Sequence, residues 1–248
     1  MSTQATFRIW RGGPADGGFR DYRTEVTEGM VVLDAVRSIQ AESANDLSLR
    51  WNCKAGKCGS CSAEVNGRPC LMCMTRMQDL PLDRPVTVEP LRAFPPLKDL
   101  VSDVSWNYRV KERIKPFKPR AADATDGTWR MAQADVDRVQ EFRKCIECYL
   151  CQDVCHLLRE SRNHDEFVGP RFLIHIAALE MHPLDDEDRV GDLKQDHGLD
   201  YCNVTKCCTD VCPEGIRITD NAIIPLKERV ADRFFDPFLR LLSRLRRK

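Results

Sequence analysis

The chain has 248 residues, and its 38 lysines and arginines balance its 38 aspartates and glutamates, so its formal net charge is zero. This balance argues against a dedicated nucleic-acid-binding protein, whose phosphate contacts require an excess of positive charge. A hydrophobic share of 42% and a charged share of 31% are typical of a globular protein. Because the sequence shows neither a secretory signal nor a stretch of roughly 18 apolar residues, we expect a protein of the cytosol or of the cytosolic side of a membrane.

The first 95 residues are predicted to form a compact α+β domain. Polar and apolar residues alternate in four segments, as they do in strands with one buried face. Leu33, Val36 and Ile39 are at helical spacing and predict a helix over residues 31–43. Asn66-Gly67 is a strong signal for a tight turn between strands. The expected strands cover residues 5–11, 19–26, 62–65 and 86–89.

Thirteen cysteines are the unusual feature of the composition, and they fall in three tight groups. Disulfides are rare in a reducing cytosol, so this many thiols indicates metal or redox chemistry. The first group has the C-x4-C-x2-C…C spacing of plant-type [2Fe–2S] ferredoxins, and its glycines allow the loop to bend sharply around a cluster. A zinc site is the alternative. The predicted [2Fe–2S] ligands are Cys53, Cys58, Cys61 and Cys73, with Cys70 as a spare thiol.

Phe94-Pro-Pro96 marks the predicted boundary between two domains, covering residues 1–95 and 96–248. Beyond it, the apolar residues from Leu97 to Tyr108 recur at helical spacing and predict an amphipathic helix. Similar patterns predict further helices over residues 136–146, 169–181 and 219–234. The second half is therefore expected to be an α-domain that holds the other two cysteine groups.

The second group, a C-x2-C-x2-C-x3-C run, is the signature of bacterial ferredoxins, in which the first three thiolates hold one cubane cluster and the fourth serves another. The third group, C-x5-C-x3-C-P, supplies partners for an interleaved pair of clusters. We predict a [4Fe–4S] cluster on Cys145, Cys148, Cys151 and Cys212, and a [3Fe–4S] cluster on Cys155, Cys202 and Cys208. Cys207 is either an inert neighbour, the interpretation we favour, or a fourth thiolate for the last cluster.

Taken together, the three motifs resemble those of the iron–sulfur subunit of succinate dehydrogenase and fumarate reductase. The resemblance implies a plant-type ferredoxin-like (β-grasp) domain followed by an all-α bacterial-ferredoxin-like domain. It also implies a redox subunit that does no bond chemistry itself. Such a subunit would relay electrons between an FAD-containing flavoprotein subunit and quinone at a membrane-anchor subunit, in either direction. It would be a peripheral subunit on the cytoplasmic face of a bacterial membrane, as part of a respiratory chain.

Two segments refine the expected partners. The start of the second motif and Asp165-Glu-Phe-Val-Gly169 resemble bacterial menaquinone-linked members with a dihaem cytochrome b anchor. Ubiquinone-reducing members have Pro, Trp and His around the quinone, whereas the corresponding residues here are His156-Leu-Leu-Arg-Glu160 and Asn203-Val-Thr205. The alternatives are a subunit serving a different flavoprotein dehydrogenase and a zinc-stabilised structural protein. Residues 236–248 predict a basic amphipathic helix, suited to an anionic membrane surface, to the anchor or to its own domain.

Overall fold

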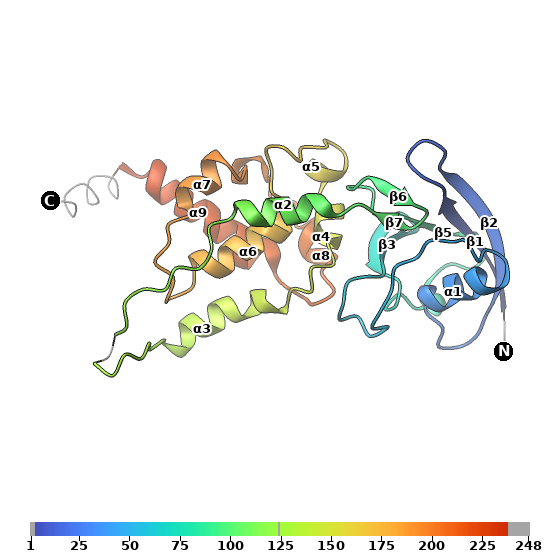
Figure 1. Ribbon diagram of the computed structural model, residues 1–248, viewed down its shortest axis with the longest axis horizontal. Helices are drawn as coiled ribbons and strands as arrows, with labels where there is room; N and C mark the ends of the chain where they lie inside the picture. The colour runs from blue at the N-terminus through green and yellow to red at the C-terminus, as the bar shows by residue number, and fades with distance from the viewer. Residues whose placement is uncertain (1–2, 124, 238–248) are drawn as a thin grey trace.

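The computed structural model describes residues 3–123 and 125–237. A sheet domain with the N-terminus forms one end of an elongated molecule, and a helical domain forms the other (Figure 1). The two predicted classes of structure therefore occupy separate ends of the chain. The cysteine-bearing segments lie between them and inside the helical domain, so the arrangement of the two domains decides how the thiols meet.

A five-stranded sheet with the strand order β2-β1-β5-β3-β4 forms the sheet domain. Strands β1 and β5 run parallel, and the other neighbours are antiparallel. The strands are β1 (Thr3–Arg11), β2 (Gly18–Val26), β3 (Ser62–Val65), β4 (Arg68–Leu71) and β5 (Val86–Glu89), and helix α1 covers Val32–Glu42. All four predicted strands and the predicted helix are thus confirmed, and β4, which follows the predicted turn, is the strand of this sheet for which the sequence pattern gave no bounds.

The alternating pattern of β1 explains the core of this domain. Phe7 and Ile9 are fully buried and pair with Val86 and Val88 of β5. Burial of one such side chain stabilises the fold by about 1.5–3 kcal/mol. The turn after β3 also follows the prediction, because Asn66 and Gly67 have φ angles of 49° and 76°, as a type I′ turn requires.

The helical domain is built from short helices, two of which carry cysteines. Its helices are α2 (Ser105–Arg113), α3 (Gln133–Gln140), α4 (Leu150–Asp153), α5 (His156–Arg159), α6 (Pro170–Glu180), α7 (Val190–Gln195), α8 (Cys207–Asp210) and α9 (Ile224–Phe234). A π-helix over Ile218–Ile223 leads into α9, and 3₁₀ turns cover Glu141–Lys144 and Leu199–Tyr201. The helices expected over 169–181 and 219–234 are confirmed, whereas of the helix expected over 136–146 only the part up to Gln140 is α-helical, followed by a 3₁₀ turn to Lys144.

The helix expected from Leu97 to Tyr108 is wrong over its first half. Residues 96–102 form a short hairpin of β6 (Pro96–Lys98) and β7 (Val101–Ser102), and α2 begins only at Ser105. Asp99 causes this difference: it has a left-handed φ of 50° at the hairpin turn. Its buried carboxylate accepts hydrogen bonds from the backbone of Gly12 and Ser48 and from the Arg11 guanidinium. These bonds to the sheet domain hold the segment in the turn despite its helical pattern.

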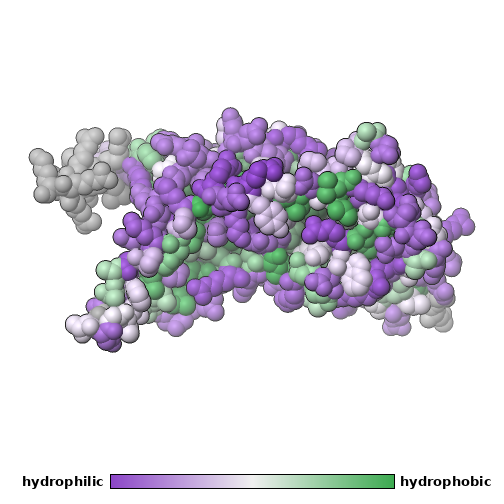
Figure 2. Space-filling model, viewed as in Figure 1, coloured by the Kyte–Doolittle hydropathy of each residue, from purple (hydrophilic) through white to green (hydrophobic). Residues whose placement is uncertain are grey.

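The segment that leads into α3 projects from the helical domain (Figure 1). Figure 2 shows a mostly hydrophilic face, with hydrophobic residues gathered in the hollow beside this projection. No helix within the described residues is both long and apolar enough to cross a membrane. The basic amphipathic helix predicted for residues 236–248 lies almost entirely outside the described part of the chain.

Candidate metal centres

The first cysteine group lies in the loop between α1 and β3 and just after β4. Cys58 neighbours Cys53, and Cys61 neighbours both Cys73 and Cys58, so the four predicted thiols meet at one place. The backbone N–H groups of Ala55 and Lys57 donate to Cys53 Sγ at 3.4 and 3.3 Å. N–H donors aimed at sulfur are what tune the potential of an iron–sulfur cluster.

The spare thiol of this region, Cys70, has a different environment. It is half-buried, and the Thr75 hydroxyl donates a hydrogen bond to its sulfur at 3.1 Å. Burial raises the pKa of Cys70, so the thiol stays protonated at neutral pH. It lines a groove between the domains together with Leu150 and Cys212.

The second group surrounds a small cavity in the helical domain. Cys145, Cys148, Cys151 and the distant Cys212 all line it. Burial raises the pKa of Cys148 to about 12, so its thiol is neutral unless a metal displaces the proton. The structure thus brings together the four residues predicted to hold the [4Fe–4S] cluster.

A second cavity collects the remaining thiols. Cys155, Cys202 and Cys208 line it, and so does Cys207. Burial raises the pKa of Cys208 to about 12, and the neighbouring Cys207, Cys202 and Cys155 raise it further. His156 lines the same cavity. The three thiols predicted for the [3Fe–4S] cluster are therefore together, with the fourth thiol beside them.

Strained backbone is concentrated at these cysteine segments. Among the described residues, eight that are not glycine have a positive φ, and five of these lie within two residues of predicted ligands: Lys54, Glu147, Tyr149, Val204 and Lys206. A left-handed φ costs about 1–3 kcal/mol outside glycine, and is most unfavourable for a β-branched residue such as Val204. Such strain is typical of functional sites, and here it turns the chain sharply where thiols must converge on one centre.

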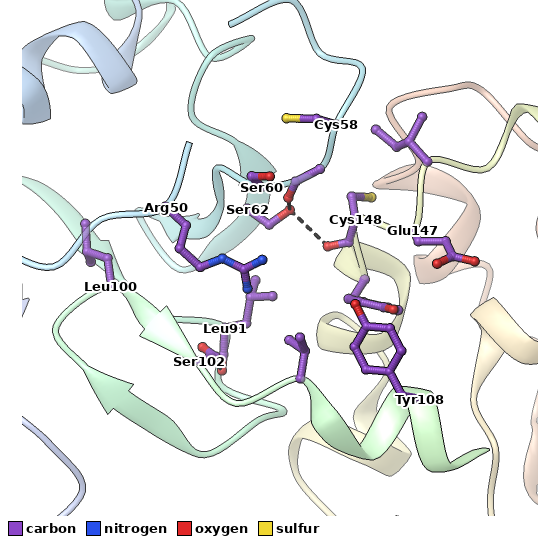
Figure 3. Close-up of a pocket in the computed structure, with 14 residues that line it drawn as sticks. Arg50, Cys58, Ser60, Ser62, Leu91, Leu100, Ser102, Tyr108, Glu147 and Cys148 are labelled. Atoms are coloured by element: carbon purple, nitrogen blue, oxygen red, sulfur yellow. Dashed lines mark hydrogen bonds between the residues drawn. The ribbon is translucent and has the colours of Figure 1, made fainter. Parts of the chain in front are cut away.

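The loops of the first and second groups are in direct contact. A Cβ added to Gly59 would lie 2.7 Å from Cys148 Cα, so only glycine permits this approach. Ser62 Oγ donates a hydrogen bond to the Cys148 carbonyl at 2.9 Å (Figure 3). On the outer surface, Lys57 Nζ is 3.0 Å from Glu214 Oε1, which joins the first loop to the segment that follows Cys212.

Figure 3 shows the cleft beside this contact, with Cys58, Ser60 and Ser62 on one wall and Glu147 and Cys148 on the other. The sequence pointed to Gly59 only as a small residue of a bent loop and gave no sign of the contact between domains. Contacts of this kind depend on tertiary packing, and the one local clue is that Gly59 and Ser62 lie on either side of the predicted ligand Cys61.

A buried acidic pair also joins the domains. Glu64 on β3 and Asp153 on α4 are both fully buried, and Arg159 Nη2 is 2.7 Å from Glu64 Oε2. Burial raises the pKa of Glu64 to about 8, and the nearby Asp153 carboxylate raises it further. Asp153 Oδ1 accepts a hydrogen bond from the Ala93 N–H at 2.8 Å. Nothing in the sequence pattern indicated this pair, although Asp153 lies inside the second cysteine motif.

The donor sets fit iron–sulfur clusters. Each of the three places gathers three or more thiols from segments held by strained backbone, and the first has N–H groups directed at sulfur. Within residues 3–123 and 125–237, no group of three or more His, Cys, Asp or Glu side chains is arranged to hold a single metal ion.

Comparison with known families agrees with this organisation. Residues 6–108 match the model of a 2Fe-2S iron-sulfur cluster binding domain, and residues 141–216 match that of a 4Fe-4S dicluster domain. The first match contains the first cysteine group, and the second contains the other two. The predicted fold class and the predicted [2Fe–2S] and [4Fe–4S] cofactors are therefore confirmed, while the domain boundary after residue 95 stays a prediction.

Individual relatives cover most of the chain. The fumarate reductase iron-sulfur subunit of Mycobacterium tuberculosis is 33% identical over 205 residues, which are 80% of each protein. The subunit of the same name from Wolinella succinogenes is 29% identical over 93% of this chain and 96% of its own length. A chain of the Mycobacterium smegmatis Sdh1 complex in the apo form is 57% identical, with a TM-score of 0.91, covering 96% of this chain and 99% of that one. The chain therefore belongs to the family of iron–sulfur subunits of succinate dehydrogenase and fumarate reductase, as a redox-relay subunit of that oxidoreductase.

Proposed function

We propose that this chain is an electron carrier between two partner subunits. It accepts electrons from an FAD-containing flavoprotein subunit, which oxidises succinate, and delivers them to quinone at a membrane-anchor subunit. Reduction of fumarate by the reverse flow uses the same path. The observation that carries the proposal is the direct contact of the first and second cysteine loops, through Gly59, Ser62 and Cys148.

The second and third places also lie close to each other. Cys151 is on α4, Cys155 immediately precedes α5, and Cys208 is among the charges that raise the pKa of the buried Cys151 thiol. The first group therefore contacts the second, and the second neighbours the third. Such a succession suits stepwise transfer of single electrons.

We assign the ligands as the sequence predicts. Cys53, Cys58, Cys61 and Cys73 hold the [2Fe–2S] cluster, Cys145, Cys148, Cys151 and Cys212 hold the [4Fe–4S] cluster, and Cys155, Cys202 and Cys208 hold the [3Fe–4S] cluster. The assignment is supported by the thiols that share each cavity and by the dicluster domain matched over residues 141–216. When bound, the clusters supply one-electron redox chemistry, and the protein adjusts their potentials through burial and N–H donors.

The lining of the cavity that contains Cys155, Cys202 and Cys208 supports a proposal about the quinone. His156, Leu157 and Asn203 line its wall, without the tryptophans expected around ubiquinone. We infer menaquinone as the acceptor and a cytochrome b anchor, with two haems, on the cytoplasmic face of the membrane. Purified complex should reduce a menaquinone analogue faster than a ubiquinone analogue of equal chain length, and the reverse preference would contradict this assignment.

The relay is tested by interrupting it in the middle. Cys151→Ser in the intact complex removes one thiolate of the second cluster, whereas Cys70→Ser removes a thiol outside the three ligand sets. With Cys151→Ser, succinate should still reduce an artificial dye that accepts electrons at the flavoprotein, while quinone reduction should be lost. With Cys70→Ser both activities should persist. Normal quinone reduction by a Cys151→Ser complex that lacks the second cluster would refute the relay.

A further inference from the structure

We propose that Cys207 is a reserve ligand, whose thiolate lets the third centre bind a fourth iron when that centre is reduced and ferrous iron is available. The inference rests on the proposed assignment of a three-iron centre to Cys155, Cys202 and Cys208. It gives a chemical role to a thiol that neither the relay nor the fold requires.

The position of Cys207 supports this role. Cys207 lines the same cavity as the three assigned ligands, so four thiols surround one space. Three thiolates match a three-iron centre, which is a cubane with one corner missing. A fourth thiol at the same cavity is the donor that the missing corner needs.

The backbone explains how two consecutive cysteines can both face this cavity. Lys206 has a left-handed φ of 64°, and α8 begins immediately afterwards at Cys207. Neighbouring residues of a helix point about 100° apart, because a turn contains 3.6 residues. The cavity is formed around this first turn of the helix. Cys208 is therefore buried on the inner side of the helix, and Cys207 is half-buried on its outer side.

The environment of Cys207 leaves its sulfur available. Its hydrogen-bond partner is the Thr205 hydroxyl at 3.2 Å, on an exposed part of the loop. Cys208, by contrast, is buried against Thr219 Oγ1, 3.6 Å away. Cys207 and Cys202 are both half-buried, so ferrous iron can reach this side of the centre from solvent. A metal site requires such an entry path as well as donors.

The step balances without an external oxidant. The reduced three-iron centre, [3Fe–4S]⁰, binds Fe²⁺ and becomes [4Fe–4S]²⁺; the Cys207 sulfur forms one new S–Fe bond, and its thiol proton leaves to solvent. The electron that first reduces the centre comes from the relay itself. The added Fe²⁺ and thiolate change the cluster type and its net charge, and both set the reduction potential. Binding of the fourth iron therefore changes the potential at which the last centre delivers electrons to quinone.

The test uses the intact complex under anaerobic conditions. Wild type, Cys207→Ser and Cys70→Ser are reduced with dithionite, incubated with ferrous ammonium sulfate, desalted and mildly reoxidised. Iron is then counted, and the EPR signal of the oxidised three-iron centre is recorded. Wild type and Cys70→Ser should lose most of this signal and gain one iron per complex. Cys207→Ser should keep the signal and gain none.

Other results would overturn the proposal. A signal that survives in wild type, or that disappears equally in Cys207→Ser, would show that Cys207 does not hold the added iron. Loss of the three-iron signal from untreated Cys207→Ser would make Cys207 a permanent ligand instead. The absence of a three-iron signal from both untreated wild type and untreated Cys207→Ser would refute the assignment of the third centre, and with it the basis of this proposal.

Discussion

The contact between the two domains depends on the missing side chain of Gly59. An alanine at this position would have a Cβ 2.7 Å from Cys148 Cα and 2.9 Å from Cys148 Cβ, and neither backbone nor Cβ atoms can move away cheaply. Overpacking of this kind costs about 1–3 kcal/mol. Gly59 also has a φ of 68°, for which alanine costs a further 1–2 kcal/mol or so.

The chain offers a matched control for the conformational cost of placing alanine at a positive φ. Gly67 has a φ of 76°, and an added Cβ there meets no atom within 4 Å. Gly67→Ala therefore carries the conformational cost without the clash. The difference between the two variants, about 1–3 kcal/mol, corresponds to roughly a 5- to 150-fold shift of the docking equilibrium between the domains.

Hydrogen–deuterium exchange on the purified complex measures this shift. In Gly59→Ala, the amides of residues 145–151 should exchange faster than in wild type, whereas Gly67→Ala should leave them unchanged. Iron content is checked first. If Gly59→Ala loses iron, Ser62→Ala, which removes the hydrogen bond to the Cys148 carbonyl, takes its place with the same expected direction. Equal exchange in the Gly59, Gly67 and Ser62 variants would refute the contact as the link between the domains.

Three further outcomes concern pH and iron. Burial raises the pKa of Glu64 to about 8 from 4.5, so the folded protein binds a proton that the unfolded chain releases, and stability falls as pH rises from 4.5 to 8. Glu64→Gln should flatten this part of a plot of unfolding temperature against pH. An unchanged slope would contradict the buried acid. Burial lowers the pKa of His175 to about 4 from 6.5, so its contribution to stability is lost as pH falls from 6.5 to 4, and His175→Gln should weaken that loss in the same assay. Removing iron with a chelator should lower the helical circular dichroism signal and speed exchange in α4, α5 and α8, whereas the sheet over residues 3–89 should stay protected. Equal loss in both domains would show that the sheet also depends on bound iron.

The sequence was sufficient for those features that depend on local patterns. The strands and α1 follow from alternation and helical spacing, and the thiols that meet at each place follow from cysteine spacing. The hairpin at Asp99 could not be predicted, because its cause is a set of hydrogen bonds to residues about 50 to 90 positions away in the chain. The buried pair of Glu64 and Asp153 escaped notice for the same reason.

The role of Cys207 illustrates the limit most clearly. Spacing alone allowed it to be inert or a ligand, since adjacent cysteines rarely hold the same cluster comfortably. The start of α8 at this residue, after a left-handed Lys206, lets Cys207 line the shared cavity together with Cys208. That geometry depends on a strained backbone, which no propensity scale would have favoured.

The relay through this subunit is tested most directly by EPR of the natively purified complex, recorded anaerobically before and after the addition of succinate. The account predicts that succinate alone changes the signals of the centres in the helical domain as well as that of the [2Fe–2S] cluster. If only a strong chemical reductant changes them, the centres do not lie on a path from succinate oxidation. If the protein contains zinc and gives no iron signal, the redox account is wrong.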